Sequence, residues 1–396
     1  MTHASHPLPH LGGLTASEFL RDYWQKKPLL VRNAFPDLPG MVDRDDLFEL
    51  AQEDGIEARL VLEKGGKSPW ELRKGPFTPK QYRQLPETHW TLLVQAVDHY
   101  FPELAAYWEH FRFIPAWRTD DIMISSAPKG GSVGPHYDQY DVFLVQGQGQ
   151  RRWQLGEICN SHSPRLAGTP LRILQEMKVT FDEIVNPGDL LYVPPGLAHF
   201  GVAENDCLTY SFGFRAPILS HVLERLVDAA LESAGTDTLY ADPDLLPQPH
   251  PGWLNPVHLQ AIKAQVLELL RDHARPAQVL APFLSEAKYS DYEPVGEEIS
   301  PEELMAALRG GARLCRDPAS RMLYTGEAGH ADHLYINGEA IEDLPDGRFV
   351  ACLVDHRQLD WESLQVWLDD ADNQDWLCEQ MAQGFWLLLG DDDDDE

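Results

Sequence analysis

The spacing of apolar residues along the chain changes near residue 121 and again near residue 217. Between these points the apolar runs are short and separated by glycine and proline turns, which is typical of an all-β barrel or sandwich. The segment QGQGQ lies between two alternating runs and is expected to form a hairpin loop. The expected strands cover residues 121–128, 140–146, 151–156, 178–185, 189–195 and 208–214.

Helical patterns lie on both sides of this β-rich region. The segment TASEFLRDYWQKK predicts a helix with a capping box from Thr15 to Glu18, followed by a strand in PLLVRNAF. After residue 216, two long segments carry the broad apolar faces of a helix bundle or a dimer interface. Helices are expected over residues 43–52, 89–101, 219–234, 257–274, 300–310 and 361–371, and a hairpin over 322–341.

These patterns divide the chain into regions. We expect a catalytic domain over 1–216, a helical region over 217–280, a winged-helix-like domain over 281–390 and a disordered acidic tail over 391–396. The fold class is therefore α+β.

Charge is distributed unevenly between these regions. The chain has a formal net charge of −31, and residues 217–396 hold 11 basic and 36 acidic residues, a net charge of −25. Such a surface repels phosphate, so direct nucleic-acid binding is disfavoured and a basic protein partner is favoured. Solubility alone, or adaptation to a salty habitat, also explains the charge.

The composition also bears on the compartment. The sequence has no apolar run of about 18 residues, so we expect no membrane span. Its first residues lack the basic and apolar blocks of a signal peptide. The five cysteines are scattered and never form C-x-x-C, which indicates reduced thiols in a cytoplasmic protein.

The segment GGSVGPHYDQYDVF contains the first candidate for chemistry. In a strand, residues two apart point to the same face, so His136 and Asp138 are expected to project side by side. This pair is either a surface pair on a half-exposed strand or part of a metal site. Tyr137 is expected to point to the opposite face.

The segment NPGDLLYVPPGLAHFG offers a third ligand. A strand leads into a Pro-Pro-Gly turn, which restricts the direction of the following side chain, and His199 comes three residues after Gly196. Two imidazoles and one carboxylate form the facial triad typical of non-haem Fe(II), which leaves positions open for a cosubstrate and dioxygen. We therefore expect His136, Asp138 and His199 to bind iron.

The two segments resemble the two halves of the cupin pattern. Asp138 replaces the usual second histidine, and this difference points to the Jumonji-C oxygenases. FLRDYWQKKPLLVR, DDIMIS, GPHYDQYDVFLVQGQGQRRWQLG, PPGLAHFG and NDCLTYSFGFRAP resemble the ribosomal oxygenases of that group. The resemblance covers residues 15–217 and is closest to bacterial enzymes that hydroxylate an arginine of the sixteenth large-subunit ribosomal protein.

The resemblance implies a double-stranded β-helix, or jelly roll, followed by a helical dimerisation region and a small winged-helix domain. It implies Fe(II), 2-oxoglutarate and dioxygen at the active site, with Arg151 binding the far carboxylate of 2-oxoglutarate. Arginine suits this role because its planar fork binds a carboxylate through two hydrogen bonds. Arg152 is expected to point to the opposite face.

The resemblance further implies a basic ribosomal protein as substrate, hydroxylated at the β-carbon of an arginine, and a homodimer. An arginine pocket requires carboxylates or aromatic rings. The candidates close to the triad in sequence are Tyr137, Tyr140, Asp141, Asp120 and Asp121. Ser125 and Ser211 are candidates for hydrogen bonds to the cosubstrate or the substrate.

Two other functions remain open from the residues. One is a cupin metalloenzyme that does not use 2-oxoglutarate. The other is a non-catalytic module that holds a basic protein through its acidic C-terminal half.

Overall fold

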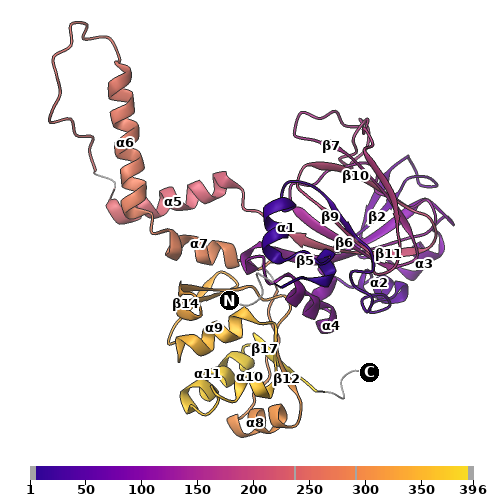
Figure 1. Ribbon diagram of the computed structural model, residues 1–396. Helices are drawn as coiled ribbons and strands as arrows, with labels where there is room; N and C mark the ends of the chain where they lie inside the picture. The colour runs from indigo at the N-terminus through magenta and orange to yellow at the C-terminus, as the bar shows by residue number, and fades with distance from the viewer. Residues whose placement is uncertain (1–5, 236–237, 290–291, 391–396) are drawn as a thin grey trace. The chain divides into compact units, whose positions relative to one another are not determined.

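The computed structural model describes residues 6–235, 238–289 and 292–390 (Figure 1). The chain forms two compact units, Met1–Ala216 and Pro217–Glu396, each with its own hydrophobic core. The tail that we expect to be disordered, residues 391–396, lies outside the described residues.

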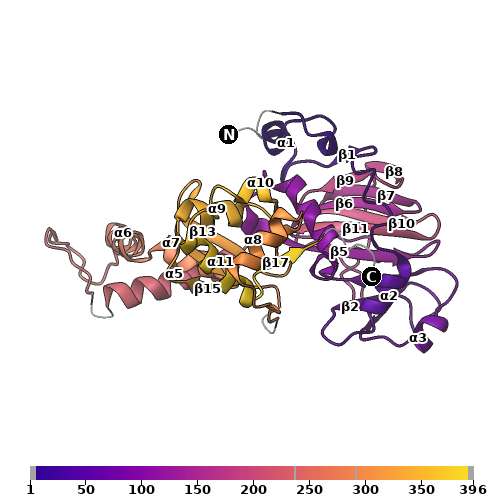
Figure 2. The same ribbon diagram turned by 90° about the horizontal axis from the view of Figure 1, so that it is seen from below.

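Two antiparallel sheets dominate the first unit (Figure 2). Their strands are β1 (Leu29–Val31), β2 (Ala58–Leu62), β3 (Glu71–Lys74), β4 (Trp90–Val94), β5 (Thr119–Ala127), β6 (Asp141–Gln148), β7 (Arg151–Ile158), β8 (Phe181–Val185), β9 (Leu190–Val193), β10 (Leu197–Ala203) and β11 (Cys207–Phe214). The larger sheet has the order β1-β9-β6-β11-β5-β4-β2-β3, and the smaller sheet has the order β10-β7-β8.

Short helices accompany the larger sheet: α1 (Ala16–Asp22), α2 (Arg44–Leu50), α3 (Pro79–Arg83) and α4 (Pro102–Ala105). The predicted capping box of α1 is confirmed. The backbone N–H of Glu18 donates to Oγ1 of Thr15 at 3.1 Å, and the backbone N–H of Thr15 donates to the Glu18 carboxylate at 2.8 Å. Both hydrogen bonds satisfy donors that a helix start otherwise leaves unpaired.

Strands β4, β6, β9 and β11 of the larger sheet bury both of their faces. Because successive side chains alternate, Phe143 of β6 and Phe212 of β11 pack in an aromatic core with residues of the short helices. Val142 and Ser211, their neighbours on the same strands, line a cavity instead. The same alternation on β2, β4 and β5 sends every second side chain into this cavity. The sheet therefore separates a core from a site.

The helix expected over residues 89–101 is wrong. Residues Trp90–Val94 form β4, all five of them buried, and a short 3-10 helix, Val97–His99, follows. A continuous apolar run has no periodicity that separates a buried strand from a buried helix. Burial between two layers, not local preference, selects the strand.

Strands occur in all six segments where the sequence predicts them, and in PLLVRNAF, where β1 forms. The hairpin expected at QGQGQ is wrong, because β6 lies in the larger sheet and pairs with β9 and β11, while β7 lies in the smaller sheet and pairs with β8 and β10. The segment is instead a tight turn between the two sheets: Gly149 and Gln150 join β6 to β7, and Gly149 has a φ of 60°. Glycine adopts this left-handed conformation without the steric penalty of a side chain. The sequence did not predict β2, β3 or β10.

The second unit begins with helices. These are α5 (Leu219–Ala234), α6 (Pro256–His273) and α7 (Pro276–Ser285) (Figure 1). The prediction for α5 is confirmed to the residue, and that for α6 is confirmed within one residue at each end. Helix α6 has no buried residue among the described positions, although several of its side chains are large and apolar.

The rest of the second unit mixes helices with small antiparallel sheets. The helices are α8 (Pro301–Arg309), α9 (Gly347–Asp355), α10 (Trp361–Leu364) and α11 (Ala371–Ala382), and the strands are β12 (Arg313–Arg316), β13 (Met322–Glu327), β14 (His330–Ile336), β15 (Glu339–Ile341), β16 (Gln358–Leu359) and β17 (Trp386–Leu389). The hairpin over 322–341 is confirmed as β13-β14-β15. The helix expected over 361–371 ends at Leu364, because the chain turns before α11 begins.

Within residues 6–235, 238–289 and 292–390, no helix combines the length and the apolar character that crossing a membrane requires.

A buried ion pair ties separate segments of the first unit together. The carboxylate of Asp141 is fully buried and accepts hydrogen bonds from the Tyr192 hydroxyl at 2.6 Å, the Gln25 amide at 3.0 Å and the Arg118 guanidinium at 3.1 Å. Burial raises the pKa of Asp141, and these donors oppose the increase. Asp141 is therefore a structural residue.

We predict that Asp141→Ala lowers the free energy of unfolding of the first unit by about 3–5 kcal/mol, because it leaves Arg118 with an uncompensated buried charge. Denaturant titration followed by circular dichroism measures this change. Asp182→Ala is the control, since Asp182 pairs with Arg152 at 2.9 Å on the surface, and its change should be much smaller. Equal changes in the two variants would contradict a structural role for the buried pair.

Candidate metal centre

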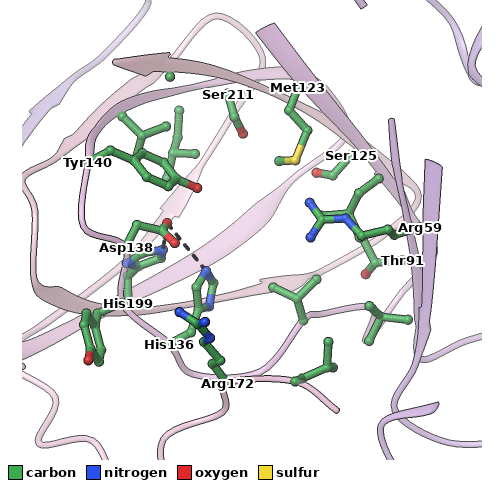
Figure 3. A pocket seen from close by; sticks show the side chains of 18 of the residues that line it. Arg59, Thr91, Met123, Ser125, His136, Asp138, Tyr140, Arg172, His199 and Ser211 are labelled. Atoms are coloured by element: carbon green, nitrogen blue, oxygen red, sulfur yellow. Dashed lines mark ion pairs between the residues drawn. The ribbon is translucent and has the colours of Figure 1, made fainter. Parts of the chain in front are cut away.

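Three side chains from the two predicted segments converge. Among the described residues, one group of side chains could hold a metal ion: His136, Asp138 and His199. One possible ligand atom of each lies within 4.8 Å of those of the other two. A carboxylate oxygen of Asp138 lies 3.5 Å from Nε2 of His199 and 3.9 Å from Nε2 of His136 (Figure 3). One ion can therefore contact all three.

Backbone hydrogen bonds hold the two ligand segments against each other. His136 and His199 exchange N–H···O bonds of 3.0 and 2.8 Å in an isolated antiparallel bridge. The backbone N–H of Gly196 donates to the carbonyl oxygen of Asp138 at 2.7 Å. The expectation that His136 and Asp138 share one face of a strand needs correction, because His136 forms only an isolated bridge and Asp138 lies in the irregular segment between that bridge and β6. The pairing aligns the ligands instead.

The two histidines present the same nitrogen to the centre. Nδ1 of His136 lies 2.9 Å from the carbonyl oxygen of Gly134, and Nδ1 of His199 lies 2.9 Å from that of Leu197. A carbonyl only accepts, so each Nδ1 carries the proton and each neutral ring keeps a lone pair on Nε2. Metal-binding histidines are commonly oriented in this way. The donor set therefore fits a divalent metal ion.

Burial also keeps one imidazole neutral. His199 lies on β10 with 3% of its surface exposed. Burial, together with the adjacent imidazole of His136, lowers the pKa of His199. A neutral imidazole is the form that binds a metal.

A cavity of 510 Å³ opens from the three ligands between the two sheets. Arg59, Thr91, Ser125 and Ser211 reach it from the larger sheet, and Arg151 reaches it from the smaller one. Apolar side chains complete the walls: Val61, Leu93, Val142, Leu144 and Trp153. A cavity of this size holds a small cosubstrate together with part of a substrate.

Arg151 is the buried cation of this cavity. Its side chain is on β7, is 3% exposed and lies with its guanidinium carbon 5.8 Å from the centre of the Trp153 ring. Its Nε has no hydrogen-bond partner among the described residues. Arg152 points to the opposite face, as predicted, and pairs with Asp182 and Glu204 on the surface. Of these two neighbouring arginines, Arg151 is the one that lines the cavity.

The other predicted residues are distributed around the same cavity. Ser125 and Ser211 lie on β5 and β11, facing it (Figure 3). Tyr140 lies beside Asp138, and burial followed by the Asp138 charge raises the pKa of its hydroxyl, which stays protonated. Tyr137 also lines the cavity, and its hydroxyl accepts a hydrogen bond from Arg165 at 2.9 Å.

The predicted aspartates separate into two groups. Asp120 and Asp121 line the cavity from β5, and a carboxylate oxygen of Asp121 accepts the backbone N–H of Ala96 at 2.7 Å. Asp141 is not among the residues that line the cavity; it is held in the ion pair with Arg118.

Several lining residues were not predicted from the sequence. Arg59 and Thr91 lie on β2 and β4, and the alternation in ARLVL and WTLLV would have indicated them if these segments had been assigned as strands. Met123 lies between Asp121 and Ser125 on β5 and follows the same alternation. Arg172 is exposed in the loop before β8, at the cavity near His136, and no local pattern indicates it.

Two family patterns match the chain. Residues 106–222 match the JmjC domain, and residues 268–387 match the ROXA-like winged helix. The first match contains all three ligand residues, and the second covers the small sheets and helices of the second unit. The fold class predicted from the sequence is confirmed.

Curated relatives match over most of the chain. The probable ribosomal oxygenase of Haemophilus influenzae is 39% identical over 89% of this chain and 88% of its own. The ribosomal protein uL16 3-hydroxylase of Escherichia coli is 35% identical over 94% of this chain and 97% of its own.

Solved structures of the Escherichia coli ribosomal oxygenase YcfD are also similar. One matches with a TM-score of 0.79 and 34% identity, over 95% of this chain and 98% of that chain. Another, in complex with cobalt and 2-oxoglutarate, matches with a TM-score of 0.77 and 35% identity, over 95% and 99%.

The barrel, the cavity and the His-Asp-His group define a protein of the JmjC class. The similarity to the two relatives extends over nearly the whole chain, so it identifies a family within this class. The chain belongs to the ribosomal oxygenase family, as its resemblance in sequence predicted, and it is a dioxygenase.

We predict that His136→Ala and His199→Ala each weaken Co(II) binding by about 100-fold or more, because each removes one of three ligands. Titration calorimetry without oxygen measures the affinity. His330→Ala, in the β13–β14 hairpin, is the control and should bind as the unchanged protein does. Binding that survives loss of either ligand would place the metal elsewhere.

Proposed function

We propose that this protein is an Fe(II)- and 2-oxoglutarate-dependent hydroxylase that modifies the β-carbon of an arginine in ribosomal protein uL16. The observation that carries the proposal is the group of His136, Asp138 and His199 at the end of a cavity that contains an unpaired buried arginine. Among the relatives, one is named as a hydroxylase of ribosomal protein uL16, and the structure of another contains bound 2-oxoglutarate. The arginine is our inference.

We propose His136, Asp138 and His199 as the ligands of Fe(II). With 2-oxoglutarate, bound Fe(II) supplies the activation of dioxygen that hydroxylation of an unactivated C–H bond requires. The hydrogen bonds of both Nδ1 atoms fix the ring orientations, so Nε2 of His136, Nε2 of His199 and the Asp138 carboxylate would hold the ion.

Arg151 is proposed to bind the far carboxylate of 2-oxoglutarate. A guanidinium that is 97% buried without a carboxylate partner is unfavourable, and a cosubstrate carboxylate supplies the missing charge and acceptors. Ser125 and Ser211 are proposed as further hydroxyl donors beside it. This unpaired cation favours the 2-oxoglutarate enzyme over a cupin enzyme that uses no such cosubstrate.

The same cavity offers acceptors for an arginine side chain. We propose that Asp120 and Asp121 attract the guanidinium, while the hydroxyls of Tyr137 and Tyr140 and the ring of Tyr140 position it. The apolar walls exclude water from the reacting carbon. Lysine has a single rotatable ammonium and fits such a planar arrangement less well.

We predict that the protein, Fe(II) and 2-oxoglutarate add one oxygen atom to an arginine of uL16 and form succinate in equal amount. Tandem mass spectrometry locates the added oxygen. A uL16 peptide with that arginine replaced by lysine is the matched control and should remain unmodified. If another residue gains the oxygen, the arginine assignment is wrong and the oxygenase assignment stands.

We also propose that the protein is a cytoplasmic homodimer and that it does not bind nucleic acid directly. Helix α6 exposes Leu259, Ile262 and Val266 at helical spacing, so these side chains form one apolar stripe on a helix without a buried residue. A second copy would cover this stripe. The net charge of −25 over residues 217–396 opposes binding of a phosphate backbone.

We predict that Val266→Glu converts the dimer to a monomer of 44.8 kDa, because it places a charge in the apolar stripe. Light scattering after size exclusion measures the mass. Ala264→Glu adds the same charge on the other side of α6 and should remain dimeric. A monomeric mass for the unchanged protein would exclude the homodimer.

A further inference from the structure

The partner of Arg151 inside the protein is unusual. Its Nη2 donates to the sulfur of Cys207 at 3.5 Å, and no ion pair of Arg151 is present within the described residues. Arg118, in the same unit, has a side chain that is 12% exposed, and it meets the carboxylate of Asp141 at 3.1 Å. The fold therefore provides a carboxylate for one enclosed arginine and the sulfur of a cysteine for the other.

Cys207 and Arg151 lie where the ends of β5, β7, β10 and β11 meet. Cys207 is the first residue of β11 and pairs with Ala127 at the end of β5, while Arg151, the first residue of β7, pairs with Ala203 at the end of β10. Cys207, Ala127 and Ala203 form a small buried cluster. Cys207 is 4% exposed and is not among the residues that line the cavity, so the thiol lies behind the guanidinium.

A thiol at this position has a specific physical effect. Sulfur is a weak acceptor, so it orients one N–H of the guanidinium without neutralising its charge. A carboxylate at the same position would form a charge-assisted, bidentate pair with Arg151, and the cosubstrate would then have to displace it. Nε of Arg151 has no hydrogen-bond partner among the described residues, which leaves this N–H for an incoming carboxylate.

We propose that Cys207 is a positioning residue that orients Arg151 while leaving its charge for the far carboxylate of 2-oxoglutarate. This inference rests on the proposed role of Arg151 in binding the cosubstrate. It assigns Cys207 no contact with the cosubstrate. Its effect is confined to carboxylates that reach Arg151.

Two substitutions of nearly equal shape separate charge from packing. Cys207→Asp provides an internal carboxylate for Arg151, and we expect it to weaken 2-oxoglutarate binding by about 100-fold. Cys207→Asn has the same shape without the charge, and we expect it to weaken 2-oxoglutarate binding by about tenfold or less.

Two further substitutions test the hydrogen-bond acceptor. Cys207→Ala removes the acceptor, and we expect it to weaken 2-oxoglutarate binding by about fivefold, with little change in kcat. Cys207→Ser retains a neutral acceptor and should bind within about threefold of the unchanged protein.

The measurement is titration calorimetry of the full-length protein loaded with Mn(II) in the absence of oxygen. The affinity for 2-oxoglutarate depends on its contact with the metal and on the contact of its far carboxylate with Arg151. Oxalate binds the metal but has no far carboxylate, so its affinity should be the same in all variants. Cys315→Ser, which removes a buried thiol of the second unit, is the control for loss of a cysteine. Mn(II) affinity and the thermal unfolding temperature show whether each variant is folded.

The outcomes separate this inference from the proposed function. If Cys207→Asp and Cys207→Asn weaken 2-oxoglutarate equally, or if oxalate weakens with them, Cys207 only packs and the positioning role is overturned. If Cys207→Asp does not fold, an unchanged 2-oxoglutarate affinity in Cys207→Ala overturns it. If the unchanged protein binds 2-oxoglutarate no better than Arg151→Ala does, the proposed cosubstrate site itself fails.

Discussion

The backbone pairing of His136 with His199 determines where the metal centre lies. These two hydrogen bonds, with the third from Gly196 to Asp138, join the loop before β6 to the start of β10 and the turn that precedes it. They bring together Asp138 and His199, which are 61 residues apart in the sequence. Gly196 has a φ of 78°, so the turn requires a conformation that side chains other than glycine rarely adopt. The Pro-Pro-Gly sequence thus fixes the backbone of the turn, and the N–H of Gly196 in that turn donates to Asp138.

The larger sheet separates the aromatic core of the first unit from the cavity that contains the candidate metal ligands. Alternate residues of β4, β5, β6 and β11 build an aromatic core on one face and a cavity on the other. The core holds the strands rigidly, so Ser125, Ser211 and the aspartates of β5 keep fixed positions around the metal ligands. Arg151 reaches the cavity from the smaller sheet, and Cys207 contacts its guanidinium through sulfur. We propose that the positive charge of Arg151 is thereby kept for a ligand.

The sequence alone predicted the three candidate ligands that the structure brings together, and most strands, because turn residues and spacing are local signals. It also placed Arg151 and Arg152 on opposite faces, which follows from strand alternation. It failed for β4, where a fully buried strand lacks any periodicity, and for the geometry of Asp138, which depends on pairing with a distant turn. Asp141 shows the same limit: its sequence position near the triad gives no indication that Arg118, Gln25 and Tyr192 surround it.

The most direct measurement is anomalous diffraction from crystals of the protein grown with Mn(II) and 2-oxoglutarate. We predict one manganese ion bound by Nε2 of His136, Nε2 of His199 and the carboxylate of Asp138, with the far carboxylate of 2-oxoglutarate on Arg151. A manganese ion bound by other residues, or a cosubstrate carboxylate that points away from Arg151, would contradict this structure of the site.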